Sequence, residues 1–208
     1  MNIILLSMTD NLQVNWKKSL SNEIAKRGNR IAYISSEPQY GERPYYISTI
    51  KDYKAVNENI TVDYFDLSKD FSDEALEGLL TYGTIYLCGG NTYVYLNDAR
   101  KRNIYPILKK HLENGGLLIG ASAGSIMMTL SIDLASVEDE NTPGIKDTEG
   151  FGFLDFEFHP HYIESDNNFL QKYNKERAVK IYICKDGDGI FCNDDGITLF
   201  GEVKEFLL

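Results

Sequence analysis

A serine set between small residues is the first feature of the sequence that could do chemistry. Residues 117–130 read LLIGASAGSIMMTL, which places Ser122 at the centre of a G-x-S-x-G pattern between an apolar run and a helical pattern. This arrangement is typical of a sharp strand-to-helix turn that exposes the serine hydroxyl and tolerates only small neighbours. The backbone N–H of Ala123 would then donate to an oxyanion. The pattern predicts a nucleophile. The alternative is a glycine-rich turn in which the serine has no chemical role, since such a turn can show the same five-residue pattern.

A serine nucleophile needs a general base, and the chain has three histidines. His111 lies near the C-terminal end of a predicted helix, where a histidine often only complements the helix dipole. His159 and His161, in the segment EFHPHYIES, follow a strand-like apolar run. A base at the end of such an element can face a serine at a strand end, so we expect the base to be one of this pair.

The base in turn needs a carboxylate that orients its ring. The expected chain order is serine, acid, histidine, and the residues alone do not choose among the acids between Ser122 and His161. These are Asp133, Glu138, Asp139, Glu140, Asp147, Glu149, Asp155 and Glu157.

Gly89 and Gly90 end another apolar run, TIYLCGG. Glycines let backbone amides approach a ligand closely. If this strand neighbours the serine strand, the N–H groups of Gly90 and Ala123 form an oxyanion hole. The alternative is a simple glycine turn.

The elements that must position these residues alternate along the chain. Apolar runs predict strands over 2–7, 30–36, 60–67, 84–90 and 117–121, and helical spacing predicts helices over 13–28, 43–58, 72–83 and 104–116. Such alternation predicts an α/β fold with a mostly parallel sheet and helices on both faces. Functional groups of such sheets lie beyond the carboxyl ends of the strands. Residues 136–152 are expected to form a loop, and 178–208 an antiparallel edge with Asp-Gly turns.

Length and composition narrow the class of protein. A chain of 208 residues is expected to form one domain. Its net charge of −10 disfavours nucleic acid and anionic membranes as partners. Three cysteines without CxxC spacing and an N-terminus without signal-peptide features predict a cytoplasmic protein. Neither a metal nor another cofactor is expected. The sequence does not fix the oligomeric state and is compatible with a homodimer.

Taken together, these residues resemble a known family. The segment CGGNTYVYLNDARKRNIYPILKKHLENGGLLIGASAGS, followed by HPHY, is similar to the dipeptidase E family of serine peptidases, the aspartyl dipeptidase and cyanophycinase group. The resemblance covers most of the chain and is strongest over 86–162. It implies a fold like that of the class I glutamine amidotransferases, with serine in place of cysteine, and hydrolysis of short peptides.

The resemblance also implies roles for particular residues. Ser122 matches the family nucleophile, and His161, directly after Pro160, matches the family base in preference to His159. The glycine pair of GGNT matches an oxyanion-hole segment, which falls on Gly90 together with Ala123. The spacing of the family acid points to Asp139, with Glu138 as the alternative.

Substrate contacts are less well defined by the resemblance. Asn91 and Thr92 are expected to meet polar groups of the substrate. Family members that cleave after an N-terminal aspartate use basic residues beyond the histidine, for which Lys172, Lys175 and Arg177 are the candidates. Two other interpretations remain open: an esterase or amidase of the α/β-hydrolase kind, and a binding protein without activity on the same fold.

Overall fold

The computed structural model describes residues 1–9, 11–36, 43–69 and 72–206. Their strands form a seven-stranded and a three-stranded sheet. The strands of the large sheet are β1 (Asn2–Leu6), β2 (Arg30–Ser35), β3 (Thr61–Asp66), β4 (Thr84–Leu87), β5 (Leu117–Ala121), β8 (Gly189–Asn193) and β9 (Gly196–Phe200). The small sheet contains β6 (Glu157–His159), β7 (Ile181–Ile183) and β10 (Lys204–Phe206).

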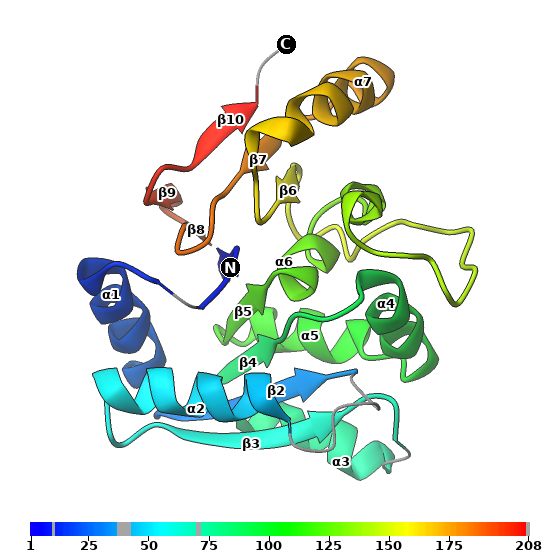
Figure 1. Cartoon of the computed structure of the whole chain (residues 1–208). Helices are drawn as coiled ribbons and strands as arrows, with labels where there is room; N and C mark the ends of the chain where they lie inside the picture. The colour runs from blue at the N-terminus through cyan, green and yellow to red at the C-terminus, as the bar shows by residue number, and fades with distance from the viewer. Residues whose placement is uncertain (10, 37–42, 70–71, 207–208) are drawn as a thin grey trace.

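The large sheet has the order β3-β2-β4-β5-β1-β8-β9 (Figure 1). Its first five strands are parallel, and β8 and β9 add an antiparallel edge beyond β1. The predicted mostly parallel sheet and its antiparallel C-terminal edge are therefore confirmed. The inner parallel strands β2, β4, β5 and β1 are short, largely apolar runs, as expected of strands buried on both faces, whereas the edge strand β3 is partly exposed.

Helices connect these strands. They are α1 (Val14–Ala25), α2 (Pro44–Val56), α3 (Asp73–Gly78), α4 (Thr92–Lys101), α5 (Tyr105–Glu113), α6 (Ala123–Met127) and α7 (Asn167–Arg177), with short 3-10 turns η1 (Leu79–Thr81), η2 (Asp133–Val137) and η3 (Glu164–Asp166). The chain moves along the sheet in one direction from β1 through β2 to β3, and in the other from β3 through β4 to β5. Right-handed crossovers therefore place α1 and α2 on one face and α3 to α5 on the other. Figure 1 accordingly shows α2 in front of the sheet and α3 behind it.

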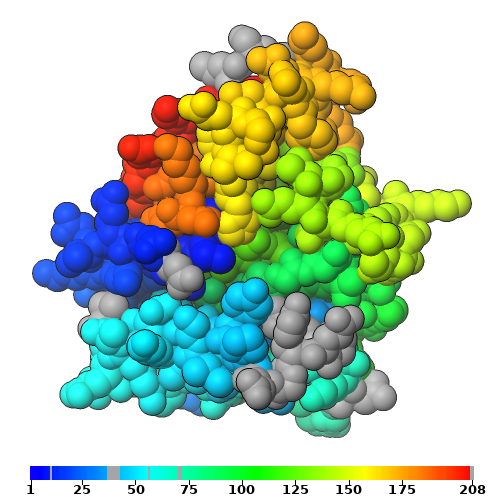
Figure 2. Space-filling model, viewed as in Figure 1, coloured from blue at the N-terminus to red at the C-terminus, as the bar shows by residue number. Residues whose placement is uncertain are grey.

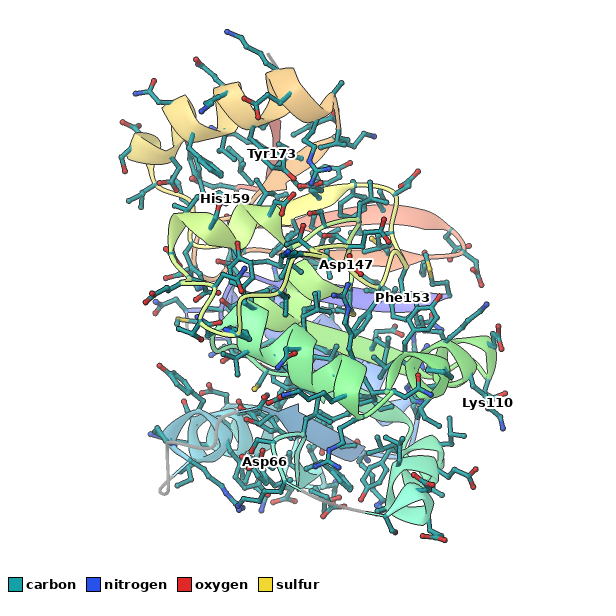
Figure 3. The ribbon with its side chains drawn as sticks, turned by 90° about the vertical axis from the view of Figure 1, so that its right-hand side faces the viewer. Asp66, Lys110, Asp147, Phe153, His159 and Tyr173 are labelled. Atoms are coloured by element: carbon teal, nitrogen blue, oxygen red, sulfur yellow. The ribbon has the colours of Figure 1, made fainter. Side chains whose placement is uncertain are left out.

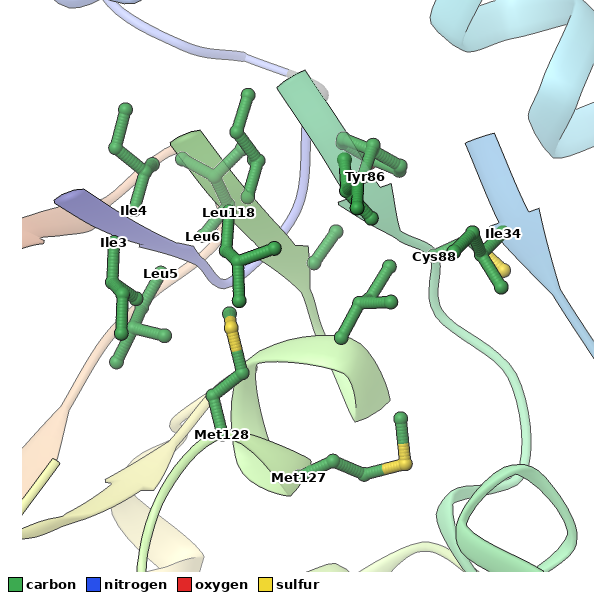
Figure 4. Close-up of a cluster of buried hydrophobic side chains, with 14 of the residues drawn as sticks. Ile3, Ile4, Leu5, Leu6, Ile34, Tyr86, Cys88, Leu118, Met127 and Met128 are labelled. Carbon is green, nitrogen blue, oxygen red and sulfur yellow. The ribbon is translucent and has the colours of Figure 1, made fainter. Parts of the chain in front are cut away.

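The core lies where β1, β4 and β5 meet α6. Figure 4 shows Met128 extending from α6 toward the side chains of β1 and β5, among them Leu6 and Leu118. These three side chains are fully buried. This packing fixes the short helix that follows Ser122 against the strands on which the site is built.

The small sheet and α7 form the upper part of the molecule, drawn yellow to red above the N-terminal residues in the space-filling view (Figure 2). A separate buried cluster holds them together, made of Leu134, Leu170, Tyr173, Ile181 and Ile183. No helix among the described residues is long and apolar enough to span a membrane.

Several elements differ from the sequence-based prediction. The sequence pattern predicted no separate helix over α4, none over α7, and no second sheet. The apolar run before His159 is a strand only at its end, β6. The segment expected as a loop lacks regular structure after η2, and Arg100 of α4 holds it by donating to the carbonyl oxygens of Asp147 and Glu149 at 2.7 and 2.8 Å.

Candidate active site

Ser122 occupies a strained turn between β5 and α6. Its φ of 51° and ψ of −115° lie in a region that residues other than glycine rarely adopt. The glycines on either side leave no room for a side chain: a Cβ on Gly124 would stand 2.2 Å from the carbonyl oxygen of Leu87, and one on Gly120 would stand 2.6 Å from the backbone of Gly124. The small residues around Ser122 are thus required by the turn that presents it.

A line of hydrogen bonds runs from this serine through His161 to Asp186. The Ser122 hydroxyl lies 2.8 Å from Nε2 of His161, and Nδ1 of His161 lies 2.6 Å from Oδ1 of Asp186. Because a carboxylate only accepts, the ring proton belongs on Nδ1 and leaves Nε2 free to accept from the serine. The His161 side chain is 18% exposed and that of Asp186 is 45% exposed.

Three different strand ends supply these residues. Ser122 follows β5 in the large sheet, His161 follows β6 in the small sheet, and Asp186 lies in the turn between β7 and β8. Ser7, at the end of β1, ties them together: its Oγ accepts from the backbone N–H of His161 at 2.8 Å and donates to Asp186 at 3.1 Å. The parallel register, with Leu6 opposite Ala121, brings Ser7 beside Ser122.

The structure does not bring Asp139 or Glu138 to His161. Asp139 Oδ2 instead accepts from the backbone N–H and the hydroxyl of Thr92, at 2.8 and 2.6 Å. Its carboxylate therefore fixes the start of α4 and does not contact the base. The position that the resemblance assigned to Asp139, against Nδ1 of the base, is taken by Asp186.

Two backbone N–H groups lie near the serine at neighbouring strand ends. Strand β4 pairs with β5, so Gly89 and Gly90 emerge next to Ser122, and a Cβ on Gly89 would stand 3.4 Å from that of Ser122. Among the described residues, neither Gly90 nor Ala123 donates its N–H to a backbone or side-chain acceptor. Both donors are available for a negatively charged oxygen at this point.

His159 has a different environment from His161. It is 3% exposed, and its Nε2 lies 3.0 Å from Oδ2 of Asp166. Burial lowers the pKa of His159 and so favours the neutral ring, in which Nε2 donates to the Asp166 carboxylate and Nδ1 carries the lone pair. Nδ1 is buried and has no hydrogen-bond partner among the described residues. Figure 3 shows His159 below α7 in the same part of the molecule as Tyr173.

Two cavities share Ser122 and Gly90 in their walls. The larger, about 430 Å³, also includes His161 and reaches the ends of β1 and β2 and the helix α2. The smaller, about 90 Å³, lies toward η2 and contains Glu138, Asp139 and His159. A substrate bound at Ser122 can therefore place groups on both sides of the reacting bond.

The sequence matches the peptidase family S51 over residues 3–200. The chain belongs to this family. An uncharacterized peptidase of Pasteurella multocida is 25% identical over 151 residues, which are 69% of this chain and 72% of that protein. Peptidase E of Shewanella amazonensis is 22% identical over 136 residues, 59% of this chain and 55% of that protein.

Solved structures show the same fold. The crystal structure of a putative peptidase E from Listeria monocytogenes matches with a TM-score of 0.77 at 19% identity, covering 99% of this chain and 98% of that one. A peptidase from an acI-B1 Actinobacterium matches with a TM-score of 0.68 at 15% identity, covering 99% and 93%. The predicted resemblance to the dipeptidase E family is confirmed, and the S51 chain is a serine peptidase rather than a binding protein or an esterase of another fold.

The expected substrate residues of this S51 peptidase divide into two groups. Asn91 lines the large cavity and caps α4 by accepting from Val94 N–H, and Thr92 lines the small one. Lys175 and Arg177 lie on α7 and line neither cavity that contains Ser122. Arg177 instead forms an ion pair with Asp133. The prediction that these two basic residues bind substrate is not supported by their positions.

Asp186 is the site residue that sequence reasoning missed. It lies beyond His161, outside the interval in which the acid was sought, in the segment KDGDG, where Asp-Gly is typical of a turn. Its side chain carried no further signal in the sequence. Among the described residues no group of three or more His, Cys, Asp or Glu side chains could hold a metal ion.

Proposed function

We propose that this S51 member is a cytoplasmic serine peptidase that hydrolyses short peptides with Ser122 as nucleophile, His161 as general base and Asp186 as the orienting carboxylate. The observation that carries the proposal is the unbroken line of hydrogen bonds from Ser122 through His161 to Asp186, set on a strained turn. The three cysteines, all free and buried, agree with a reducing compartment.

The reaction follows from the positions of the protons. Nε2 of His161 takes the proton of the Ser122 hydroxyl as Oγ attacks the scissile carbonyl carbon. The resulting imidazolium is stabilised by Asp186 and donates the same proton to the leaving amine when the C–N bond breaks. Water then attacks the acyl-enzyme with His161 again as base, which releases the acid and restores Ser122.

The oxygen of the tetrahedral intermediate needs donors as it gains negative charge. The N–H groups of Gly90 and Ala123 meet it from the ends of two adjacent strands. Fixed backbone donors of this kind typically contribute about 10²–10³ in kcat each. Thr92 supports them indirectly, because its bonds to Asp139 hold the segment after Gly90 in place.

The small cavity supports a substrate with a free amino terminus. Its charged or titratable side chains are Glu138, Asp139 and the neutral His159, all of which can accept hydrogen bonds. A volume of about 90 Å³ suits an ammonium group better than a further residue. Because Ser122 and Gly90 are in its wall, an amine bound there would lie close to the scissile carbonyl.

The proposal is tested with a panel of dipeptides and N-terminal amino-acid fluorophore amides, with aspartate among the N-terminal residues. We expect Ser122→Ala to lower kcat/KM by about 10³-fold or more, since only binding and oxyanion contributions remain. Ser136→Ala is the matched control, because Ser136 lies in η2 next to the small cavity but not in its wall. Equal hydrolysis by wild type and Ser122→Ala would refute the mechanism.

A further inference from the structure

Among the described residues, the wall of the large cavity is uncharged apart from the catalytic histidine. Besides Ser122 and His161, the described residues that line it are serines, threonines, tyrosines, Asn91 and small or apolar residues. In the sequence, none of the residues outside the described ranges is a lysine or an arginine: 37–42 read EPQYGE, and the others are Asp10, Asp70, Phe71, Leu207 and Leu208. The cavity therefore offers no cation to a carboxylate.

Two tyrosine rings are part of this wall. Tyr33 and Tyr86 stack with ring centroids 5.1 Å apart and planes at 16°, and both are at most 2% exposed. Burial raises the pKa of Tyr86 well above its ordinary value, so its hydroxyl stays protonated. Thr49 and Thr9 are hydrogen-bonding neighbours of that hydroxyl. The cavity thus combines aromatic surface with neutral hydroxyl groups.

Two carboxylates lie behind this wall. Ser36, which lines the cavity, donates to Asp98 at 2.6 Å, and Asp186 lies 2.6 Å from Nδ1 of His161. Lys101 pairs with Asp98 at 3.3 Å but is not in the wall. Two described cations lie near wall residues in sequence, and neither is in the wall: Arg43 lies over the ring of Tyr64 at 3.8 Å, and Lys51 follows Thr49 on α2. An acidic side chain entering the cavity would lose water and meet carboxylates instead of a counter-ion.

We infer that the cavity receives an uncharged side chain, aromatic or amide, from one of the two residues joined by the scissile bond, and that it excludes acidic side chains. The inference rests on the proposed function, since it takes Ser122 as the reacting group. A cavity of about 430 Å³ is within the usual range for small-ligand sites and is large enough for a tyrosine side chain.

The sharpest test compares glutamine with glutamate, because the two side chains have the same shape and differ in charge. Dipeptides Xaa-Ala and Ala-Xaa, with glutamine, glutamate or tyrosine as Xaa, are assayed with wild-type protein. At the position that the cavity accepts, kcat/KM for glutamine and for tyrosine is expected to exceed that for glutamate by roughly a hundredfold or more.

A matched pair of variants tests whether the large cavity causes the preference for glutamine over glutamate. Ser48 of α2 is half-buried and lines the cavity, whereas its neighbour Ile47 is 58% exposed and does not. Ser48→Arg is expected to lower the glutamine-to-glutamate ratio at least about tenfold, and Ile47→Arg to leave it unchanged. An unchanged ratio in Ser48→Arg, or an equal change in both variants, overturns the inference.

The outcomes separate this inference from the peptidase function. Ser122-dependent hydrolysis without preference for glutamine at either position overturns the inference and leaves the function standing. Calorimetric binding of the same dipeptides to Ser122→Ala gives a second readout: preference for glutamine there, without turnover by wild type, supports the cavity and refutes the peptidase function. Absence of both turnover and preferential binding overturns both.

Discussion

Replacing Asp186 by asparagine tests the most specific feature of the site. The substitution keeps the size of the side chain and an oxygen that can accept from Ser7, but removes the charge 2.6 Å from Nδ1 of His161. Ser7 and Nδ1 of His161 both contact Oδ1 of Asp186, so an amide oxygen there can still accept from both but carries no charge to stabilise the imidazolium. His161 would then be a poorer acceptor for the Ser122 proton.

The expected loss of kcat in Asp186→Asn depends on how far the His161–Asp186 pair is exposed to water. In a buried serine-peptidase triad, this kind of change lowers kcat by about 10⁴-fold. Here the Asp186 side chain is 45% exposed, so water screens part of its interaction with the imidazolium. We therefore expect a loss of about 10²–10³-fold in kcat, or about 3–4 kcal/mol of transition-state stabilisation.

Steady-state kinetics on the best dipeptide of the panel measure this loss, with Asp194→Asn, an exposed carboxylate in neither cavity, as the control and Asp139→Asn as the rival acid. An asparagine at 139 can still accept from Thr92 through its oxygen, so its kcat is expected to stay within about tenfold of wild type. KM is expected to change little in Asp186→Asn, because the charge acts on the base. If Asp186→Asn keeps nearly full kcat while Asp139→Asn loses a hundredfold, the assignment of the acid is wrong.

Two further predictions concern stability. Gly124→Ala is expected to destabilise the fold by about 1–3 kcal/mol, visible as a lowered melting temperature, because its Cβ would stand 2.2 Å from the rigid carbonyl of Leu87; an unchanged melting temperature would contradict this. His111 is buried, and burial lowers its pKa, so the unfolded chain takes up the proton first as pH falls below about 6.5. The contribution of the neutral His111 ring to the free energy of unfolding is therefore present above that pH and lost below it. Melting temperatures at pH 7.5 and 5.5 should differ less in His111→Gln than in wild type. An equal difference in the two proteins would refute the role of His111.

The sequence predicted the parts of this fold that repeat a strong local pattern. The inner parallel strands, such as β5, are apolar runs buried on both faces. The turn after β5 carries small residues because larger side chains would clash there, and the five-residue pattern shows this directly. Ser122 and His161 could be found for the same reason, since a serine and a histidine at element ends are rare and chemically distinctive.

The remaining features depend on contacts between distant segments. Strands β6, β7 and β10 have three residues each, too few to show a periodic pattern. The partner of His161 depends on which strand end lies beside β6 once the small sheet forms, and β7, which pairs with β6 in parallel, brings the turn with Asp186 to that point. The placement of α7 likewise decides that Lys175 and Arg177 line neither cavity with Ser122, and no local signal in the sequence encodes that placement.

The arrangement of the site depends on the hydrogen bonds of the Ser7 hydroxyl. Through it the end of β1 in the large sheet holds both His161, which follows β6, and Asp186, which follows β7 of the small sheet. A slight parting of the two sheets would leave every strand and helix intact and still separate the base from the nucleophile. We therefore expect the contacts between the two sheets to limit the temperature at which the enzyme works. On warming, activity would be lost at a lower temperature than the secondary structure seen by spectroscopy.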